Sequence, residues 1–296
     1  MKYFLLAVLS LSALVFAVYF FKDVYAKLAG ISRKSWLPLA SVGFVLNFFD
    51  TLGIGSFAPT TSFYKFTKLV DDRYIPGTLN VGHCLPVVAQ ALIFIAIVDV
   101  DPATLVSMML AATLGAVAGA GVVAKMPVGR IRLGLGLALL ILAFAMFAGL
   151  LKLFPAGGSA VGLSGWKLVI AVAMSVVFGA LQTIGIGFYA PCMALVFALG
   201  MDPRVAFPVM MGSAAMLMPW AGLKFVKQGS YDLKASLGLS VPGVVGVLLA
   251  AYVVKSLPLT VLKWVIVAVI LYASILMFRS AFLRESEAME QTNKAT

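Results

Sequence analysis

The chain has 296 residues, of which 62% are hydrophobic and 11% charged, against roughly 45–50% and about 25% in soluble domains. Its mean hydropathy is +1.08, which excludes both a soluble globule with a polar surface and a disordered chain. The net charge of +11 does not indicate nucleic-acid binding, because membrane proteins collect Lys and Arg in cytoplasmic loops. The composition therefore predicts an all-α polytopic membrane protein.

The first apolar run covers residues 3–21 and is long enough to cross a bilayer. We expect a retained transmembrane helix and a basic cytoplasmic linker, which together make up residues 1–34. A cleaved signal peptide is the alternative, because Val24-Tyr25-Ala26 is typical of a cleavage site. Six later runs have the length of ordinary spans, namely residues 77–98, 103–124, 133–151, 205–223, 235–254 and 259–278.

Two runs, residues 35–64 and 168–201, have the wrong length for a span. At about 1.5 Å per residue they would form helices of about 45–50 Å, too long for one crossing of a core of about 30 Å and too short for two. We expect each to break and return to the side from which it entered, as a re-entrant hairpin. With the N-terminus outside and the C-terminus in the cytoplasm, this arrangement of seven spans and two hairpins places most of the 22 Lys and Arg residues inside, as the positive-inside rule requires. Treating each long run as one crossing divides these residues almost evenly.

A nine-residue motif occurs once in each long run. Residues 51–59 (TLGIGSFAP) reappear as residues 183–191 (TIGIGFYAP), with six of the nine positions identical. Other landmarks keep nearly the same spacing, and the pairs are Gly82 with Gly212, Gly115 with Gly246, and Trp36 with Trp166. The chain thus divides into repeat 1 (residues 35–153), repeat 2 (residues 154–282) and a short polar tail (residues 283–296). Because each repeat holds an odd number of crossings, the second should be inverted relative to the first, as in many secondary transporters.

The glycines and proline of each motif predict a helix break. Glycine weakens a helix, and Pro59 and Pro191 suit the first turn of a new helix because they lack a backbone N–H. We therefore expect fresh helices to begin near Ser56 and in the corresponding place of the second motif. Helix N-termini offer free amide groups and a favourable dipole to an anion, so two such ends near the middle of the membrane predict an anion site. The segments contain no Lys or Arg, and their neutral polar groups are Asn47, Thr51, Ser56, Asn80, Gln182, Thr183 and Tyr189.

Asp50 and His83 are the ionisable residues expected inside the membrane, where such groups are usually functional. We consider both for proton coupling or gating. A structural role is the alternative, with Asp50 as the cap of a half-helix or as a hydrogen-bonded carboxylate, and His83 as a satisfied core histidine. One His and two Cys cannot assemble the usual metal site, and no catalytic constellation or phosphate-binding loop is present in the sequence. We therefore expect no enzyme activity, metal or cofactor.

The paired Gly-rich segments that end in Ala-Pro resemble the TauE/SafE family of sulfite and organosulfonate exporters. Thr78-Leu79-Asn80 and the Gly212-Ser213 pair, in the span that follows each hairpin, contribute to the resemblance, which covers roughly residues 35–282. The chain departs from the family where it has Gly53-Ile54-Gly55-Ser56, because many members carry three consecutive glycines there.

The resemblance implies export of sulfite, or of a sulfonate such as sulfoacetate, across a bacterial cytoplasmic membrane by alternating access. Proton-coupled uptake of a related anion such as thiosulfate is the alternative, and a membrane-embedded enzyme is a more remote one. The expected partners are a small anionic substrate, the lipid bilayer and a second copy of the chain in a homodimer. The expected substrate-binding residues are Asn47, Thr51, Gly53, Gly55, Ser56, Phe57, Thr78, Asn80, Gln182, Thr183, Gly185, Gly187, Tyr189, Gly212 and Ser213.

Overall fold

The computed structural model describes residues 2–27, 36–123, 158–182 and 188–256, with single positions from 133 to 151 and from 258 to 279. Within these ranges the chain is helical, and its only extended pairing is an isolated bridge between Ala160 and Met201. The elements are α1 (Lys2–Lys27), α2 (Trp36–Thr51), α3 (Phe57–Thr67), η2 (Asp72–Tyr74), α4 (Ile75–Gly82), α5 (Cys84–Ile97), α6 (Pro102–Val123), α8 (Gly165–Gln182), α9 (Tyr189–Ala198), η3 (Pro203–Val205), α10 (Ala206–Gln228) and α11 (Leu233–Ser256).

Five helical stretches of the described chain are long and apolar enough to cross a membrane. They are Lys2–Lys27, Ile75–Ile97, Gly165–Gln182, Pro203–Gln228 and Leu233–Val253. The expected all-α membrane class is therefore confirmed. The spans expected at residues 133–151 and 259–278 lie largely outside the described residues, and so does the whole tail. The structure contains one chain and does not test the expected homodimer.

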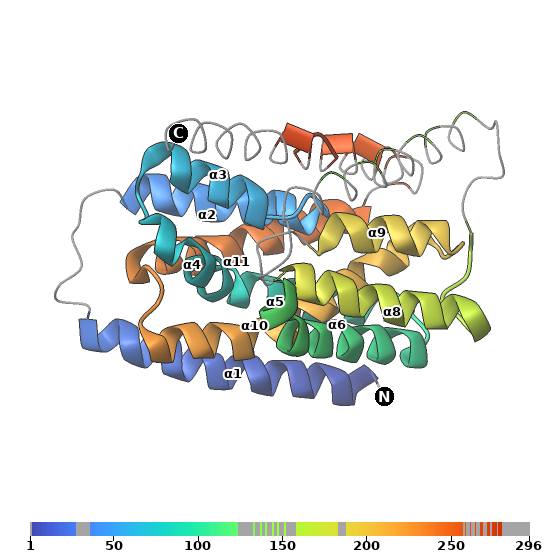
Figure 1. Cartoon of the computed structure of the whole chain (residues 1–296), viewed down its shortest axis with the longest axis horizontal. Coiled ribbons are helices and arrows are strands. Elements are labelled where there is room, and N and C mark those ends of the chain that lie inside the picture. The colour runs from blue at the N-terminus through green and yellow to red at the C-terminus, as the bar shows by residue number, and fades with distance from the viewer. Residues whose placement is uncertain are drawn as a thin grey trace, which may run out of the picture.

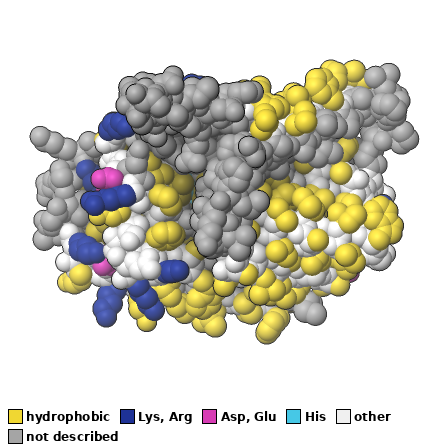
Figure 2. Space-filling view, viewed as in Figure 1, with side chains coloured by type: hydrophobic (Ala, Val, Ile, Leu, Met, Phe, Trp, Pro, Cys, Tyr) yellow, Lys and Arg dark blue, Asp and Glu magenta, His cyan; other side chains and the backbone are white. Residues whose placement is uncertain are grey.

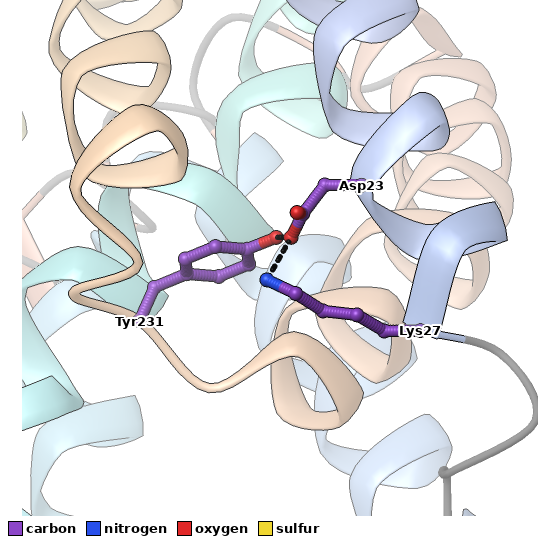
Figure 3. A network of polar contacts seen from close by, with 3 residues as sticks. All are labelled: Asp23, Lys27 and Tyr231. Atoms are coloured by element: carbon purple, nitrogen blue, oxygen red, sulfur yellow. Dashed lines mark hydrogen bonds and ion pairs between the residues drawn. The ribbon is translucent and has the colours of Figure 1, made fainter.

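Helix α1 lies along one side of the bundle and packs against α10 (Figure 1). Its buried residues recur every three or four positions, as a helix with one packed face requires. At its C-terminal end, Asp23 accepts a 2.6 Å hydrogen bond from the Tyr231 hydroxyl and forms a 2.8 Å ion pair with Lys27 (Figure 3). These contacts fix α1 to the turn between α10 and α11.

Basic side chains gather at the end of the bundle that holds this turn (Figure 2). The Lys227 ammonium lies 5.1 Å from the centroid of the Tyr19 ring, and the Lys234 ammonium lies 5.6 Å from that of Trp36. At the opposite end of α1, Lys2 approaches Asp99 to 4.0 Å. We call the end with Lys227 and Lys234 the basic end, and the end with Lys2 and Asp99 the opposite end.

Two helix pairs form the most extensive contacts among the described helices, α2 with α11 and α6 with α8. A Cβ atom at Gly246 would lie 2.4 Å from the Phe44 carbonyl oxygen, and one at Gly115 would lie 2.0 Å from that of Val176. Only glycine permits such an approach, as is usual where membrane helices pack.

The first long run breaks where its motif predicts. Helix α2 ends at Thr51 and α3 begins at Phe57, directly after Ser56. In Figure 1, α3 runs back along α2. The start of α2 lies at the basic end, because its Trp36 ring is beside Lys234. The beginning of α4 lies at the same end, because the Thr78 hydroxyl accepts a 2.9 Å hydrogen bond from the Asp232 N–H.

The second long run forms α8 and α9, and residues 183–187 between them lie outside the described chain. The Lys167 ammonium, near the start of α8, donates a 3.0 Å hydrogen bond to the Leu199 carbonyl, just after α9. The segment that precedes α8 bonds to the start of α6, where the Leu163 N–H donates to the Thr104 hydroxyl at 2.9 Å. Both ends of this run therefore lie at the opposite end of the bundle.

The expected span at residues 77–98 is divided at His83 into α4 and α5. Pro86 has no N–H to donate to the Gly82 carbonyl one turn earlier, which weakens the helix at this point. The Ser240 hydroxyl of α11 donates to that carbonyl at 2.8 Å. At the break, His83 faces Asn47 of α2 and Thr60 of α3.

Candidate functional site

A small cavity lies where the two helix breaks meet. Its volume of about 20 Å³ has room for about one water molecule. The first break, the second break and two spans all contribute to its wall, which consists of Asp50, Gly55, Ser56 and Phe57, then Gln182, Phe188 and Tyr189, and finally Val87, Ala214 and Met218. The cavity thus joins segments that are far apart in the sequence.

Two glycines with positive φ shape the first break. Gly53 has φ +96° and Gly55 has φ +83°, a conformation that L-residues with side chains rarely adopt. A Cβ at Gly53 would lie 2.3 Å from the terminal methyl carbon of Met193, whereas a Cβ at Gly55 would have no neighbouring heavy atom within 4 Å. The positive φ therefore favours glycine at position 53, where the flexible Met193 side chain of α9 lies close, and Gly55 leaves room beside the cavity.

Asp50 is buried at the end of α2 and holds the start of α3. Its Oδ1 accepts a 2.6 Å hydrogen bond from the Ser56 N–H, and its Oδ2 accepts one of 2.9 Å from Gln90 Nε2. The sequence led us to expect free amide groups at both helix starts. That expectation is wrong at Ser56, because a carboxylate of the same chain already occupies its N–H.

Gln90 of α5 connects the two halves of the chain. Its Nε2 donates to Asp50 and, at 3.1 Å, to the Thr51 hydroxyl, while its Oε1 accepts a 2.8 Å hydrogen bond from the Tyr189 hydroxyl of α9. Because an ionised carboxylate can only accept, Asp50 fixes the amide nitrogen of Gln90 toward itself, so Oε1 faces Tyr189 and accepts its hydrogen. The carboxylate of the first break therefore orients the group that binds the hydroxyl of the second.

A second polar network fixes α3 to α2. Asn47 donates to the Gly43 carbonyl at 2.7 Å, so its Oδ1 is free to accept from His83 Nδ1 at 2.9 Å. His83 Nε2 lies 3.0 Å from the Thr60 hydroxyl of α3. His83 is fully buried and does not line the cavity. Its contacts are those of a positioning residue between the two helices of the first break.

Gln182, the last residue of α8, has an unpaired polar atom at the cavity. It is 5% exposed, and its Oε1 has no hydrogen-bond partner among the described residues. A buried polar atom in this state costs free energy unless a ligand or water pairs with it. Among the described residues of the cavity wall there is no Lys or Arg, and Asp50 is the one charged side chain.

The structure brings together only part of the expected site. Asp50, Gly55, Ser56, Phe57, Gln182 and Tyr189 line the cavity, and Asn47, Thr51 and Gly53 lie directly behind it. Thr78 lies at the basic end, Asn80 donates to the Pro76 carbonyl, Gly212 packs on Met109, and Ser213 is buried without a partner for its hydroxyl among the described residues. Thr183, Gly185 and Gly187 lie outside the described residues.

Sequence reasoning missed several residues of the site. Gln90 had a signal, because it is a lone amide in an otherwise apolar run. Thr60 had none, since a hydroxyl one turn into a helix is common. The wall residues Val87, Phe188, Ala214 and Met218 are ordinary apolar residues that only the fold brings together.

Comparisons with known proteins support the family resemblance. Residues 168–296 match the family model described as sulfite exporter TauE/SafE. No curated protein and no solved structure matches the chain. The matched residues include most of α8 and all of α9, α10 and α11, and hence Gln182 and Tyr189 at the cavity. The expected resemblance to the TauE/SafE family is thus confirmed over residues 168–296.

Proposed function

We propose that the protein is a secondary transporter that exports small sulfur oxyanions, such as sulfite or an organosulfonate, and that the cavity is part of its substrate site. The observation that carries the proposal is a small cavity lined by residues of both helix breaks, one of which, Gln182, has an Oε1 atom with no hydrogen-bond partner among the described residues. Broken backbone at membrane depth is typical where it lines a substrate site. The first turns of α3 and α9 offer N–H groups that lack intrahelical acceptors.

The proposal includes an inverted repeat. The glycine contacts between α6 and α8 and between α11 and α2 support it. Gly115 meets Val176 in the first pair and Gly246 meets Phe44 in the second, and these contacts occupy equivalent places in the two halves. The helix starts support it too. The carboxylate of Asp101 accepts from the Thr104 N–H at the start of α6, and that of Asp232 accepts from the Ala235 N–H at the start of α11.

The proposal also includes two re-entrant hairpins that enter from opposite sides. The first run begins and ends at the basic end, and the second begins and ends at the opposite end. By the positive-inside rule, the basic end faces the cytoplasm. Substrate would then reach the cavity past α2 and α3 from inside and past α8 and α9 from outside.

The cavity is smaller than any sulfur oxyanion, so binding requires its wall to move. Met218 is the flexible side chain of the wall, and Gly55 is the residue without one. The membrane potential can drive export without a coupled ion, because each negative charge that leaves a negative-inside cell releases about 2.3 kcal/mol per 100 mV.

Uptake coupled to a proton is the second candidate, and the location of Asp50 in the cavity wall favours it. Uptake against the potential needs a compensating positive charge, and a membrane carboxylate is a usual proton carrier. The two directions differ in their response to a pH gradient at zero membrane potential. Such a gradient drives thiosulfate accumulation in proteoliposomes under the uptake scheme and has no effect on uniport.

The test of the proposal is sulfite efflux from proteoliposomes that contain Gly55→Leu, with Gly229→Leu as the matched control. Both glycines have positive φ and open space around the Cβ position, but only Gly55 lines the cavity. Each substitution should cost about 1–2 kcal/mol in backbone strain. Efflux should be lost with Gly55→Leu and kept with Gly229→Leu. Equal rates in both variants, or no sulfite flux in the unaltered protein, would disprove the proposal.

A further inference from the structure

We propose that the surface formed by α1 and α10 at the basic end binds the headgroup of an anionic phospholipid, such as phosphatidylglycerol. The inference concerns the outside of the bundle and does not depend on the proposed transport activity. It comes from exposed lysines and aromatic side chains that the two helices bring together, namely Lys22, Lys224 and Lys227, with Tyr19 and Trp220. We call these five residues the α1–α10 surface.

Helix α10 arranges its part of this surface along one face. Trp220, Lys224 and Lys227 are spaced by four and three residues, so they lie on the same side of the helix. All three are exposed, whereas Gly222 and Val226 between them are buried. At about 1.5 Å per residue, Lys227 lies about 10 Å nearer the helix end than Trp220. The headgroup layer is about 5–8 Å thick, so an indole at the hydrocarbon boundary places both lysines among or just above the headgroups.

Helix α1 completes the surface from the other side. The Lys227 ammonium lies 5.1 Å from the centroid of the Tyr19 ring. Lys22 follows Tyr19 by three residues, so it lies on the same flank of α1. The helices approach closely beside these residues, because a Cβ at Gly222 would lie 2.7 Å from the Phe16 ring. Ammonium groups from two helices therefore gather at one place.

The lysines of the α1–α10 surface have no acidic partner. None of the three forms an ion pair among the described residues. Helix α10 contains no Asp or Glu, and the one carboxylate of α1, that of Asp23, is bound by Lys27 and Tyr231 (Figure 3). The carboxylate of Asp232, in the turn after α10, accepts from the Ala235 N–H. A phosphate group between the lysines would offset their repulsion.

An anionic phospholipid matches this surface in both charge and polarity. Its phosphate is attracted to the ammonium groups, as basic residues at a membrane surface attract anionic headgroups, and its chains extend toward the bilayer centre past Trp220. A zwitterionic phospholipid has the same phosphate and chains, but its own cationic group cancels the charge. The surface should therefore distinguish two lipids that differ only in the headgroup.

Quenching of tryptophan fluorescence by brominated lipids tests the inference. The full-length protein is reconstituted in phosphatidylcholine vesicles that contain a fixed fraction of brominated phosphatidylglycerol or of brominated phosphatidylcholine. The signal of Trp220 is the difference between the unaltered protein and Trp220→Phe. We expect brominated phosphatidylglycerol to bind beside Trp220 at least about tenfold more tightly, since each lysine near anionic lipid strengthens binding about fivefold.

The variant with Lys224→Gln and Lys227→Gln should lower this preference at least about fivefold, because two ammonium groups leave the surface. The matched control is Lys68→Gln with Arg73→Gln. It removes two positive charges from exposed positions directly after α3 and in η2, away from α1 and α10. The control pair should change the preference by less than about twofold.

Equal quenching by the two lipids in the unaltered protein would overturn the inference. So would equal effects of the two variant pairs, because these would indicate a general attraction of lipid to the basic end. Neither result concerns sulfite efflux, which tests the proposed function separately. The comparison of the two lipids in the unaltered protein does not depend on the folding of the lysine variants.

Discussion

The bond between Gln90 and Tyr189 joins the two halves of the chain, and a double-mutant cycle can measure it. Replacing Gln90 by Leu removes the donor to the Asp50 carboxylate and leaves the buried Tyr189 hydroxyl without an acceptor. The first loss costs about 1.5–3 kcal/mol and the second about 1–3 kcal/mol, so the sum is about 2.5–6 kcal/mol. At about 2 °C per kcal/mol for a chain of this size, the unfolding temperature in detergent should fall by about 5–12 °C.

The double variant separates the pair from its surroundings. Tyr189→Phe alone should cost about 1 kcal/mol. In Gln90→Leu with Tyr189→Phe, no hydroxyl is left unpaired, so the combined cost should be smaller than the sum of the single costs by about 1–3 kcal/mol. Tyr231→Phe is the matched control, because its hydroxyl bonds to Asp23 and shares no partner with Gln90. That combination should be additive. Additive costs in the Tyr189 cycle would refute the reasoning.

Two further predictions concern helix contacts and a helix start. Gly115→Ala and Gly246→Ala should each destabilise the protein by about 1–3 kcal/mol, because the new methyl group meets a backbone carbonyl. The control Leu114→Ala, at the exposed surface, should change the unfolding temperature little. A large effect at only one of the two glycines would argue against equivalent contacts. Asp101→Ala should cost about 1 kcal/mol at neutral pH, since hydrogen bonds from the Thr104 N–H and hydroxyl hold the pKa of Asp101 below its ordinary value of 3.8. That contribution is fully present above the ordinary value and is lost as pH falls through the lowered pKa, so thermal unfolding of the two proteins should converge in acid and not at neutral pH.

The positions of the helix breaks could be predicted because they depend on local chemistry. The motif glycines and prolines disfavour a continuous helix wherever they occur, and α3 begins at Phe57, beside the expected Ser56. The length of an apolar run is also a local property, and it indicated that residues 35–64 were too long for one span. Such signals require no knowledge of the rest of the fold.

The polar contacts of the site could not be predicted, because their partners are distant in the sequence. Gln90 bonds to a tyrosine 99 residues later. The Gly82 carbonyl, to which Pro86 cannot donate, is satisfied by Ser240, 158 residues later in the chain. A run of apolar residues with one amide gives no indication of which helix will face that amide. The bond from the Ser56 N–H to Asp50 spans only six residues, and the sequence offered this cap as one role of Asp50, but it does not choose between capping and proton transfer.

The packing of α2 on α11 has a consequence for biosynthesis. Asn47 lies against the Leu239 carbonyl, 192 residues further along the chain, and the ribosome needs about 10–40 s to make that length at about 5–20 residues per second. During this delay the first hairpin, with its buried carboxylate and amides, has already left the ribosome and has no α11 to cover it. Its polar backbone cannot be left in bare lipid, so the insertion machinery or an early neighbour must shelter it until the last third of the chain arrives.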